Sequence, residues 1–123
     1  MNTIVLEKIK QEMKSMGIDY HYMYNKKETI SYPYVTGEYS ESGLESDIQK
    51  SYGDLLLECW NRGRDLDLNK VIEQIKERFD DFQTIYKNVG IAINFNSCVP
   101  RRTDDIKLKK YEIHLDVVYW KGK

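Results

Sequence analysis

The sequence predicts an α+β fold, an antiparallel sheet of four to five strands with two helices packed on one face. Three observations lead there: a long apolar stripe with helical spacing over 68–82, a narrower one near the N-terminus, and several runs in which apolar and polar residues alternate. Consecutive strands joined by short connections favour antiparallel pairing. A chain of 123 residues supports one hydrophobic core, so a single domain over 1–123 is expected.

The strongest helix signal lies in the segment 68–82. Its apolar residues follow one another at spacings of 3, 1, 3, 4 and 3, which places them on one side of a helix. Asp67 precedes them, where a carboxylate can accept the first amide hydrogens of the helix. So much apolar surface must be buried, and the flanking strands supply a sheet to cover it. The stripe consists of Leu68, Val71, Ile72, Ile75, Phe79 and Phe82.

A first helix is expected over 3–16, followed by Gly17 as a C-terminal stop. After Gly17 the alternation has a period of two, which predicts strands over about 18–36 with a polar turn between them. Pro33 removes a backbone donor, so it belongs at an edge or a bulge. The polar segment 37–50 is expected to be a long mobile loop. The first helix would bury Leu6, Ile9, Met13 and Met16.

Three later strands are expected over 52–61, 90–96 and 108–120. The first has apolar residues on both sides, which is typical of a central strand, and it turns into the second helix at 62–65. The last alternates strictly, so one of its faces should be buried and the other wet. A loop that contains Pro100 is expected between the second and third of these strands, over 97–105.

Composition restricts the function classes. The net charge of −1 gives no long-range attraction to a phosphate backbone, so no sequence-specific nucleic acid is expected as a partner. No apolar run is long enough for a membrane span, and the charged, amphipathic start lacks the apolar core of a secretory signal. Cys59 and Cys98 lack metal-ligand spacing and are expected to be reduced thiols that fill apolar space.

Catalytic and ligand-binding patterns are missing from the sequence. His21 and His114 have no Cys, Asp or Glu at ligand spacing, and no glycine-rich phosphate loop opens a helix. Acidic residues in the polar loop do not follow the spacing of a calcium site. The sequence therefore predicts neither an enzyme nor a metal or cofactor site. A hydrolase or transferase would require a deep pocket that brings one of the histidines within hydrogen-bonding reach of a carboxylate.

Six of the ten tyrosines fall between positions 20 and 39. Such rows can stack single-stranded bases, form aromatic pairs between neighbouring strands, or dock another subunit. No basic groove accompanies them, which favours the structural and interface interpretations over base stacking.

Four charged residues suggest assembly. Asp80 and Asp81 lie near the negative end of the second helix, where carboxylates are unfavourable by roughly 0.3–1 kcal/mol. Arg101 and Arg102 of a neighbouring copy could offset that cost. The alternative is a solvated helix end with nothing opposite, and the sequence alone favours it.

The order of elements resembles a known family. An amphipathic opening helix leads to an extended YPYVTGE segment at 32–38, a polar loop, and a strand that ends as LLLECWNRG at 55–63. The second helix, a strand, a proline-bearing loop and a long final strand follow. This order is similar to that of the small tail-terminator or tail-completion proteins of tailed bacteriophages and prophages, which close the tail tube and join it to the head.

The resemblance implies a non-enzymatic protomer that forms a ring, commonly a hexamer, and contacts tail-tube and head–tail connector proteins in the virion or in the host cytoplasm during assembly. Tyr32–Tyr34 match the family's extended region, and Arg62 matches a basic residue that often follows the strand. The alternative is a small cytosolic protein-binding or regulatory domain with a tyrosine-rich surface. The candidate interface residues are Tyr32, Pro33, Tyr34, Arg62, Asp80, Asp81, Arg101 and Arg102.

Overall fold

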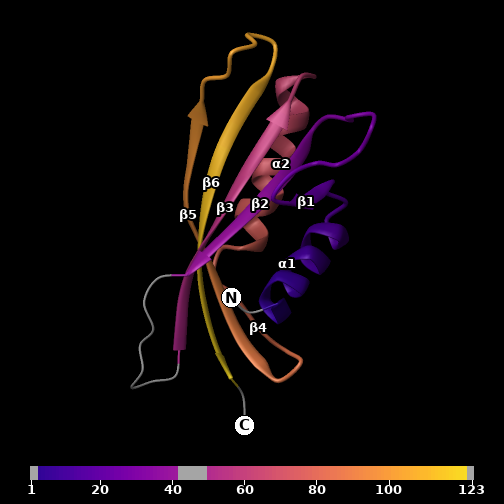
Figure 1. The fold of residues 1–123 in the computed structure, drawn as a ribbon. Coiled ribbons are helices and arrows are strands. Elements are labelled where there is room, and N and C mark those ends of the chain that lie inside the picture. The colour runs from indigo at the N-terminus through magenta and orange to yellow at the C-terminus, as the bar shows by residue number, and fades with distance from the viewer. Residues whose placement is uncertain (1–2, 42–49, 122–123) are drawn as a thin grey trace.

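The computed structural model describes residues 3–41 and 50–121, which form two helices and one six-stranded sheet (Figure 1). The spatial order of the strands is β1-β2-β3-β6-β5-β4. Strand β1 runs parallel to β2, whereas all other neighbours are antiparallel. The α+β class is therefore correct, but the expected purely antiparallel sheet of four to five strands is wrong. In chain order the elements are α1 (Thr3–Ser15), β1 (Tyr20–Tyr22), β2 (Tyr34–Glu41), β3 (Lys50–Asn61), α2 (Asp65–Arg78), β4 (Phe82–Tyr86), β5 (Val89–Arg101) and β6 (Lys109–Lys121).

Both helices pack on one face of the sheet, which we call the inner face (Figure 1). Alternate residues of β3, β5 and β6 point into the core they share with the helices, while the residues between them form the outer face. Leu6 and Met16, which the sequence placed on the buried stripe of α1, are only partly buried. The fully buried helix residues are Val5, Ile9 and Met13 of α1, and Leu68 and Ile75 of α2 with Phe79 at its end.

Helix α2 is shorter than the predicted 68–82 and begins earlier. It starts at Asp65, so Asp67 lies in its first turn and pairs with Arg64 at 3.1 Å instead of capping the helix. It ends at Arg78, and Asp81 then adopts a left-handed conformation with φ 56°. Phe82 therefore belongs to β4, a strand that the periodicity missed because Phe82 continues the apolar stripe.

The segment expected to hold strands over 18–36 contains only β1 and the start of β2. Residues 24–33, in which a polar turn and the start of a second strand were expected, pair with no strand. This segment is long enough to carry the chain back to the beginning of β1, so that β2 can run parallel to β1 with Val35 opposite Tyr20. A short hairpin turn would have forced the two strands to be antiparallel.

Six residues of the predicted mobile loop over 37–50 belong to strands. Residues 37–41 belong to β2 and Lys50 begins β3, while 42–49 lie outside the described residues. Gly37 is one of the glycines that suggested a loop, yet it lies within β2, where a Cβ would overlap the Tyr20 side chain of the neighbouring β1. This glycine makes room for a cross-strand aromatic ring, as glycines in strands often do where another group approaches closely.

Strand β5 is also longer than the predicted 90–96. It continues to Arg101 beyond an irregularity between Phe95 and Ser97, and Pro100 lies opposite Tyr111. The loop expected over 97–105 is therefore confined to the connection that follows Arg101. Among the described residues, no helix has the length and apolar character that a membrane crossing requires.

Candidate functional site

A row of aromatic and cationic side chains crosses four strands on the outer face. The strand register places Tyr34 opposite Trp60, Trp60 opposite Lys110, and Lys110 opposite Arg101. The rings of Tyr34 and Trp60 stack with centroids 6.2 Å apart and planes 18° apart. Lys110 Nζ lies 5.0 Å from the centroid of Trp60. We call these four residues the outer row.

Two carboxylates hold the cations of the outer row. Lys110 Nζ lies 2.5 Å from Glu58 and 3.5 Å from Glu112, and Arg101 Nε lies 2.7 Å from Glu112. Glu58 and Glu112 are directly opposite each other in the sheet, an arrangement that would repel without the cations between them. The hydrogen bond to Glu58 raises the pKa of Lys110, and the hydrogen bond from Arg101 lowers the pKa of Glu112.

Arg62 connects the outer row to the segment before β2. Its guanidinium lies 6.0 Å from the Tyr32 ring centroid and 2.5 Å from Asp105, and the Tyr32 ring lies 5.6 Å from that of Tyr34. The hydrogen bond to Tyr32, followed by that to Asp105, raises the pKa of Arg62. The turn that presents Arg62 is fixed by Asn61, whose buried amide donates to the Arg64 carbonyl at 2.8 Å.

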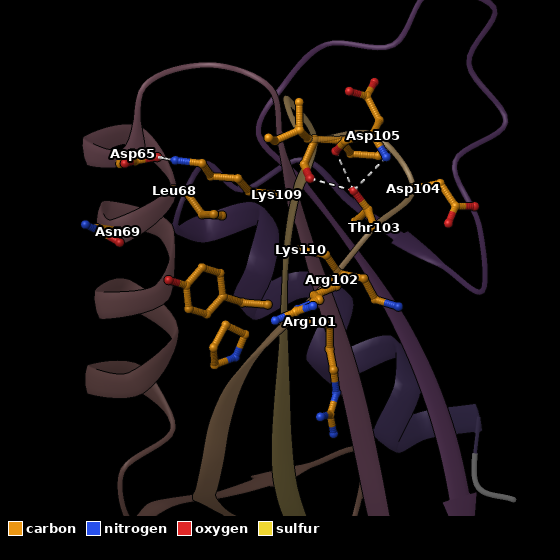
Figure 2. A pocket seen from close by; sticks show the side chains of 14 residues that line it. Asp65, Leu68, Asn69, Arg101, Arg102, Thr103, Asp104, Asp105, Lys109 and Lys110 are labelled. Carbon is orange, nitrogen blue, oxygen red and sulfur yellow. Dashed lines mark hydrogen bonds and ion pairs between the residues drawn. The ribbon is translucent and has the colours of Figure 1, made fainter.

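A hollow of about 640 Å³ opens beside the row, between the start of α2 and the β5–β6 connection (Figure 2). Leu68, Pro100 and Tyr111 contribute apolar surface, and the Asp65–Lys109 ion pair lies on its rim. The Thr103 hydroxyl braces the connection, with its oxygen 2.6 Å and 2.8 Å from two backbone carbonyl oxygens (Figure 2). An apolar floor with a charged rim suits the docking of another protein segment.

The predicted interface residues divide into two groups. The first group lies at the outer row, to which Tyr34 and Arg101 belong and beside which Tyr32 and Arg62 contact each other. Pro33 lies between the two tyrosines in the chain, and Arg102 lines the hollow.

Asp80 and Asp81 form the second group. They lie in the turn between α2 and β4, whereas the other end of α2, at Asp65, contacts Lys109 near the outer row. Within one copy they have no cationic partner among the described residues, and the bridge to a neighbour's Arg101 and Arg102 stays a prediction.

Sequence reasoning missed the two central members of the outer row, Trp60 and Lys110, and the Glu58 carboxylate that pairs with Lys110. Trp60 and Glu58 alternate with the buried Leu57 and Cys59, a pattern that assigns them to the outer face. Alternation does not reveal which residue of another strand lies opposite. That Lys110 meets both Trp60 and Glu58 depends on the β3–β6 register, which is set by contacts distant in sequence.

Both histidines lie near carboxylates, which spacing along the chain did not indicate. His21 Nε2 lies 2.8 Å from Asp19 Oδ1, an oxygen that Lys27 also approaches at 3.2 Å. His114 Nδ1 lies 3.3 Å from Asp54 across the β3–β6 pair.

The histidine pairs meet only part of the requirement set for an enzyme. His21 contributes to a hollow of about 520 Å³ beside α1, but its side chain and that of Asp19 remain partly exposed. In the described part of the chain, neither histidine hydrogen-bonds a serine, threonine or cysteine. No group of three or more potential metal ligands gathers within the same residues.

No family model matches the sequence, and no curated protein matches it. Among solved structures, a chain described as "Virion of native gene transfer agent (GTA) particle" has a similar fold, with a TM-score of 0.67. The match covers 90% of this chain and 84% of that chain, at 8% sequence identity. At this identity the likeness concerns the fold alone.

Proposed function

We propose that the chain is a non-enzymatic structural protein of a phage or prophage virion. The chain acts as a single domain. Copies of it form an oligomeric ring, for example a hexamer, that completes the tail tube and joins it to the head. The observation that carries the proposal is the similarity of fold, over 90% of the chain, to a chain of a gene transfer agent virion. The order of elements, which resembles that of tail-terminator proteins, supports the finer assignment.

The outer row supplies a suitable docking surface for such a ring. Interface cores are enriched in tyrosine, tryptophan and arginine, and their binding energy concentrates in a few large side chains. Tyr34 and Trp60 are already stacked and flanked by ion pairs, so little side-chain freedom would be lost on binding. We propose that the outer row, with Tyr32, Arg62 and Arg102, contacts the neighbouring copy or the connector.

Deletion of the gene in a particle-producing strain tests the virion role. Tails of abnormal length, or tails detached from heads, are expected in electron micrographs, and a plasmid copy should restore normal particles. Normal tails with attached heads after deletion would contradict the proposal.

Complementation with variants then tests the docking surface. Trp60→Ala should fail to restore attachment of tails to heads. Trp120→Ala is the matched control, because Trp120 lies on the same face of the sheet but at the end of β6 that is farther from Lys110 and the outer row. Equal complementation by both variants would remove the outer row from the interface.

One observation favours the alternative of a small cytosolic protein-binding domain. Tyr22, Met23 and Tyr24 are consecutive and 36%, 48% and 60% exposed, an unusual run of large apolar surface. A gene neighbourhood without tail or portal genes, together with normal particles after deletion, would support this alternative.

A further inference from the structure

Strand β4 lies at one edge of the sheet, away from the outer row. Strand β4 has the sequence FQTIY, and among the described residues it pairs with β5 alone, so its other side ends the described sheet (Figure 1). Proteins commonly protect such edges with charges, proline or bulges. Strand β4 has none of these. Helix α1 meets it at the Tyr86 hydroxyl, which lies 2.8 Å from the Gln11 amide and 2.6 Å from the Glu7 carboxylate, whereas Ile85 is 78% exposed.

The hairpin geometry shows which backbone groups of β4 face outwards. A two-residue turn at Lys87 and Asn88, both with positive φ, joins Tyr86 to Val89. In such a turn the closing pair is hydrogen-bonded, and hydrogen-bonded pairs then alternate with non-bonded pairs along the hairpin. Gln83 and Ile85 are therefore in non-bonded positions, and their backbone N–H and C=O groups point away from β5.

The same edge is self-complementary. If two copies of β4 pair antiparallel about Thr84, Gln83 of each lies opposite Ile85 of the other, and all outward groups are bonded. This register pairs all five residues, whereas centring on Gln83 or Ile85 pairs fewer. In a two-fold contact residue i of one copy meets residue j of the other and j meets i, and β4 carries no charge that would repel another copy of itself.

Charges beyond the strand ends also match in this register. Lys87 follows β4 and Asp81 precedes it, so each Lys87 lies beside Asp81 of the other copy. Lys87 is bound within its own chain by Glu7 at 2.7 Å, yet its side chain remains 56% exposed. Asp81 has no cationic partner among the residues that the structure describes, and it lies at the unfavourable end of α2.

We propose that two copies of this chain associate through antiparallel β4–β4 pairing centred on Thr84, with Lys87 of each copy beside Asp81 of the other. The contact extends the sheet across a two-fold axis. It involves neither the outer row nor the hollow beside it and does not depend on the virion role. A five-residue edge buries less surface than a standard interface, so the dimer is weak and concentration-dependent.

Cysteine cross-linking tests the register in the full-length chain. Thr84→Cys, in a Cys98→Ser background, should form a disulfide-linked dimer under mild oxidation, because non-bonded opposite residues have Cα atoms about 4.5 Å apart. Gln83→Cys alone should not, since its equivalents are diagonal, but it should cross-link when mixed with Ile85→Cys. Lys70→Cys on the exposed side of α2 is the control for random collision. Cross-linking of Thr84→Cys no faster than that of Lys70→Cys would overturn the proposal.

Sedimentation velocity over a concentration series tests the backbone pairing. Gln83→Pro should weaken dimerisation by about tenfold or more, because it removes an outward N–H that the fold does not use, whereas Gln83→Ala should change it by less than about twofold. Asp81→Asn, which retains a residue tolerant of positive φ, should weaken the dimer and flatten its salt dependence more than Asp80→Asn does. A chain that stays monomeric throughout, or equal dimerisation by Gln83→Pro and Gln83→Ala, would overturn the proposal.

Discussion

Phe79 joins the helix layer to the edge of the sheet. It is fully buried at the end of α2, where its N–H donates to the Ile75 carbonyl at 3.0 Å. Its ring meets that of Phe82 edge to face, with centroids 5.4 Å apart, so the first residue of β4 packs directly on the helix end. This contact packs Phe82, which is partly buried, against the core although the helix ends before it.

Replacing Phe79 with alanine should lower the free energy of unfolding by about 3–5 kcal/mol, because a buried ring is removed and the cavity is only partly refilled. Urea denaturation monitored by circular dichroism measures the effect. Phe79→Leu is the matched control and should cost less, since most of the volume is kept. A loss below about 1 kcal/mol for Phe79→Ala would show that the site is not packed as described.

Gly90 illustrates how a single residue can be fixed by a neighbour on another strand. It lies opposite Trp120, and a Cβ added there would overlap the indole ring. Lys50 holds the other side of that indole, with its Nζ 5.5 Å from the Trp120 ring centroid. The ring therefore has a preferred position over the glycine.

Gly90→Val should destabilise the protein by about 1–3 kcal/mol, because the indole must leave its place over the backbone. In a Trp120→Ala background the same substitution should cost much less, or stabilise the strand through β-propensity. Thermal unfolding of the four proteins in this cycle gives the coupling. Equal costs in both backgrounds would mean that the indole is not the obstacle.

At the scale of elements, periodicity identified what is local and missed what is set by pairing. The stripe from Leu68 to Phe79 predicted a helix because its spacing is a property of the segment itself. Phe82 fitted the same stripe, yet the turn at Asp81 releases it into β4, and only packing against β5 decides this. The parallel β1–β2 pair likewise depends on where the chain returns after residue 33, which alternation does not specify.

The candidate site shows the same division. Tyr34 and Arg62 were found as sequence signals, and Trp60 was assigned to its face by alternation. The partners of Trp60 could not be found, because they come from β2 and β6 and are fixed by the register of three strands.

The Tyr34–Trp60 stack is a property of the β2–β3 pair and can be measured as a coupling. Tyr34→Ala and Trp60→Ala should show an interaction energy of about 0.5–1.5 kcal/mol in a double-mutant cycle, as for other aromatic pairs. Chemical denaturation of the single and double variants supplies the four values. As a control, Tyr34→Ala with Trp120→Ala should be additive within about 0.5 kcal/mol, since these residues lie at opposite ends of the sheet. Additivity in the first cycle would indicate that the stack contributes nothing beyond burial.

At the scale of the molecule, carboxylates connect elements that are far apart in the sequence. Glu7 and Glu12 of α1 pair with Lys87 and Arg78 at 2.7 Å and 2.6 Å. Asp105 pairs with Arg62, and Glu112 pairs with Arg101. The pKa of each of these four carboxyls lies below its ordinary value, so their ionised forms favour the folded state. These contacts should therefore weaken together in acid.

The acid response of Glu112 can be isolated. The hydrogen bond from Arg101 is the largest cause that lowers its pKa below the ordinary value of 4.5. A lowered folded-state pKa gives stability that is present above pH 4.5 and is lost as the pH falls through the folded-state value. Glu112→Gln should thus reduce the free energy of unfolding at neutral pH. Below pH 4.5 the free energy of unfolding of this variant should fall less steeply with pH than that of the wild type, by a difference in slope that corresponds to less than one bound proton. Urea titrations at a series of pH values measure both effects, with Glu73→Gln on the exposed side of α2 as the control. An unchanged slope in Glu112→Gln, or a wild-type protein that gains stability as the pH falls below 4.5, would contradict the role assigned to the Arg101–Glu112 pair.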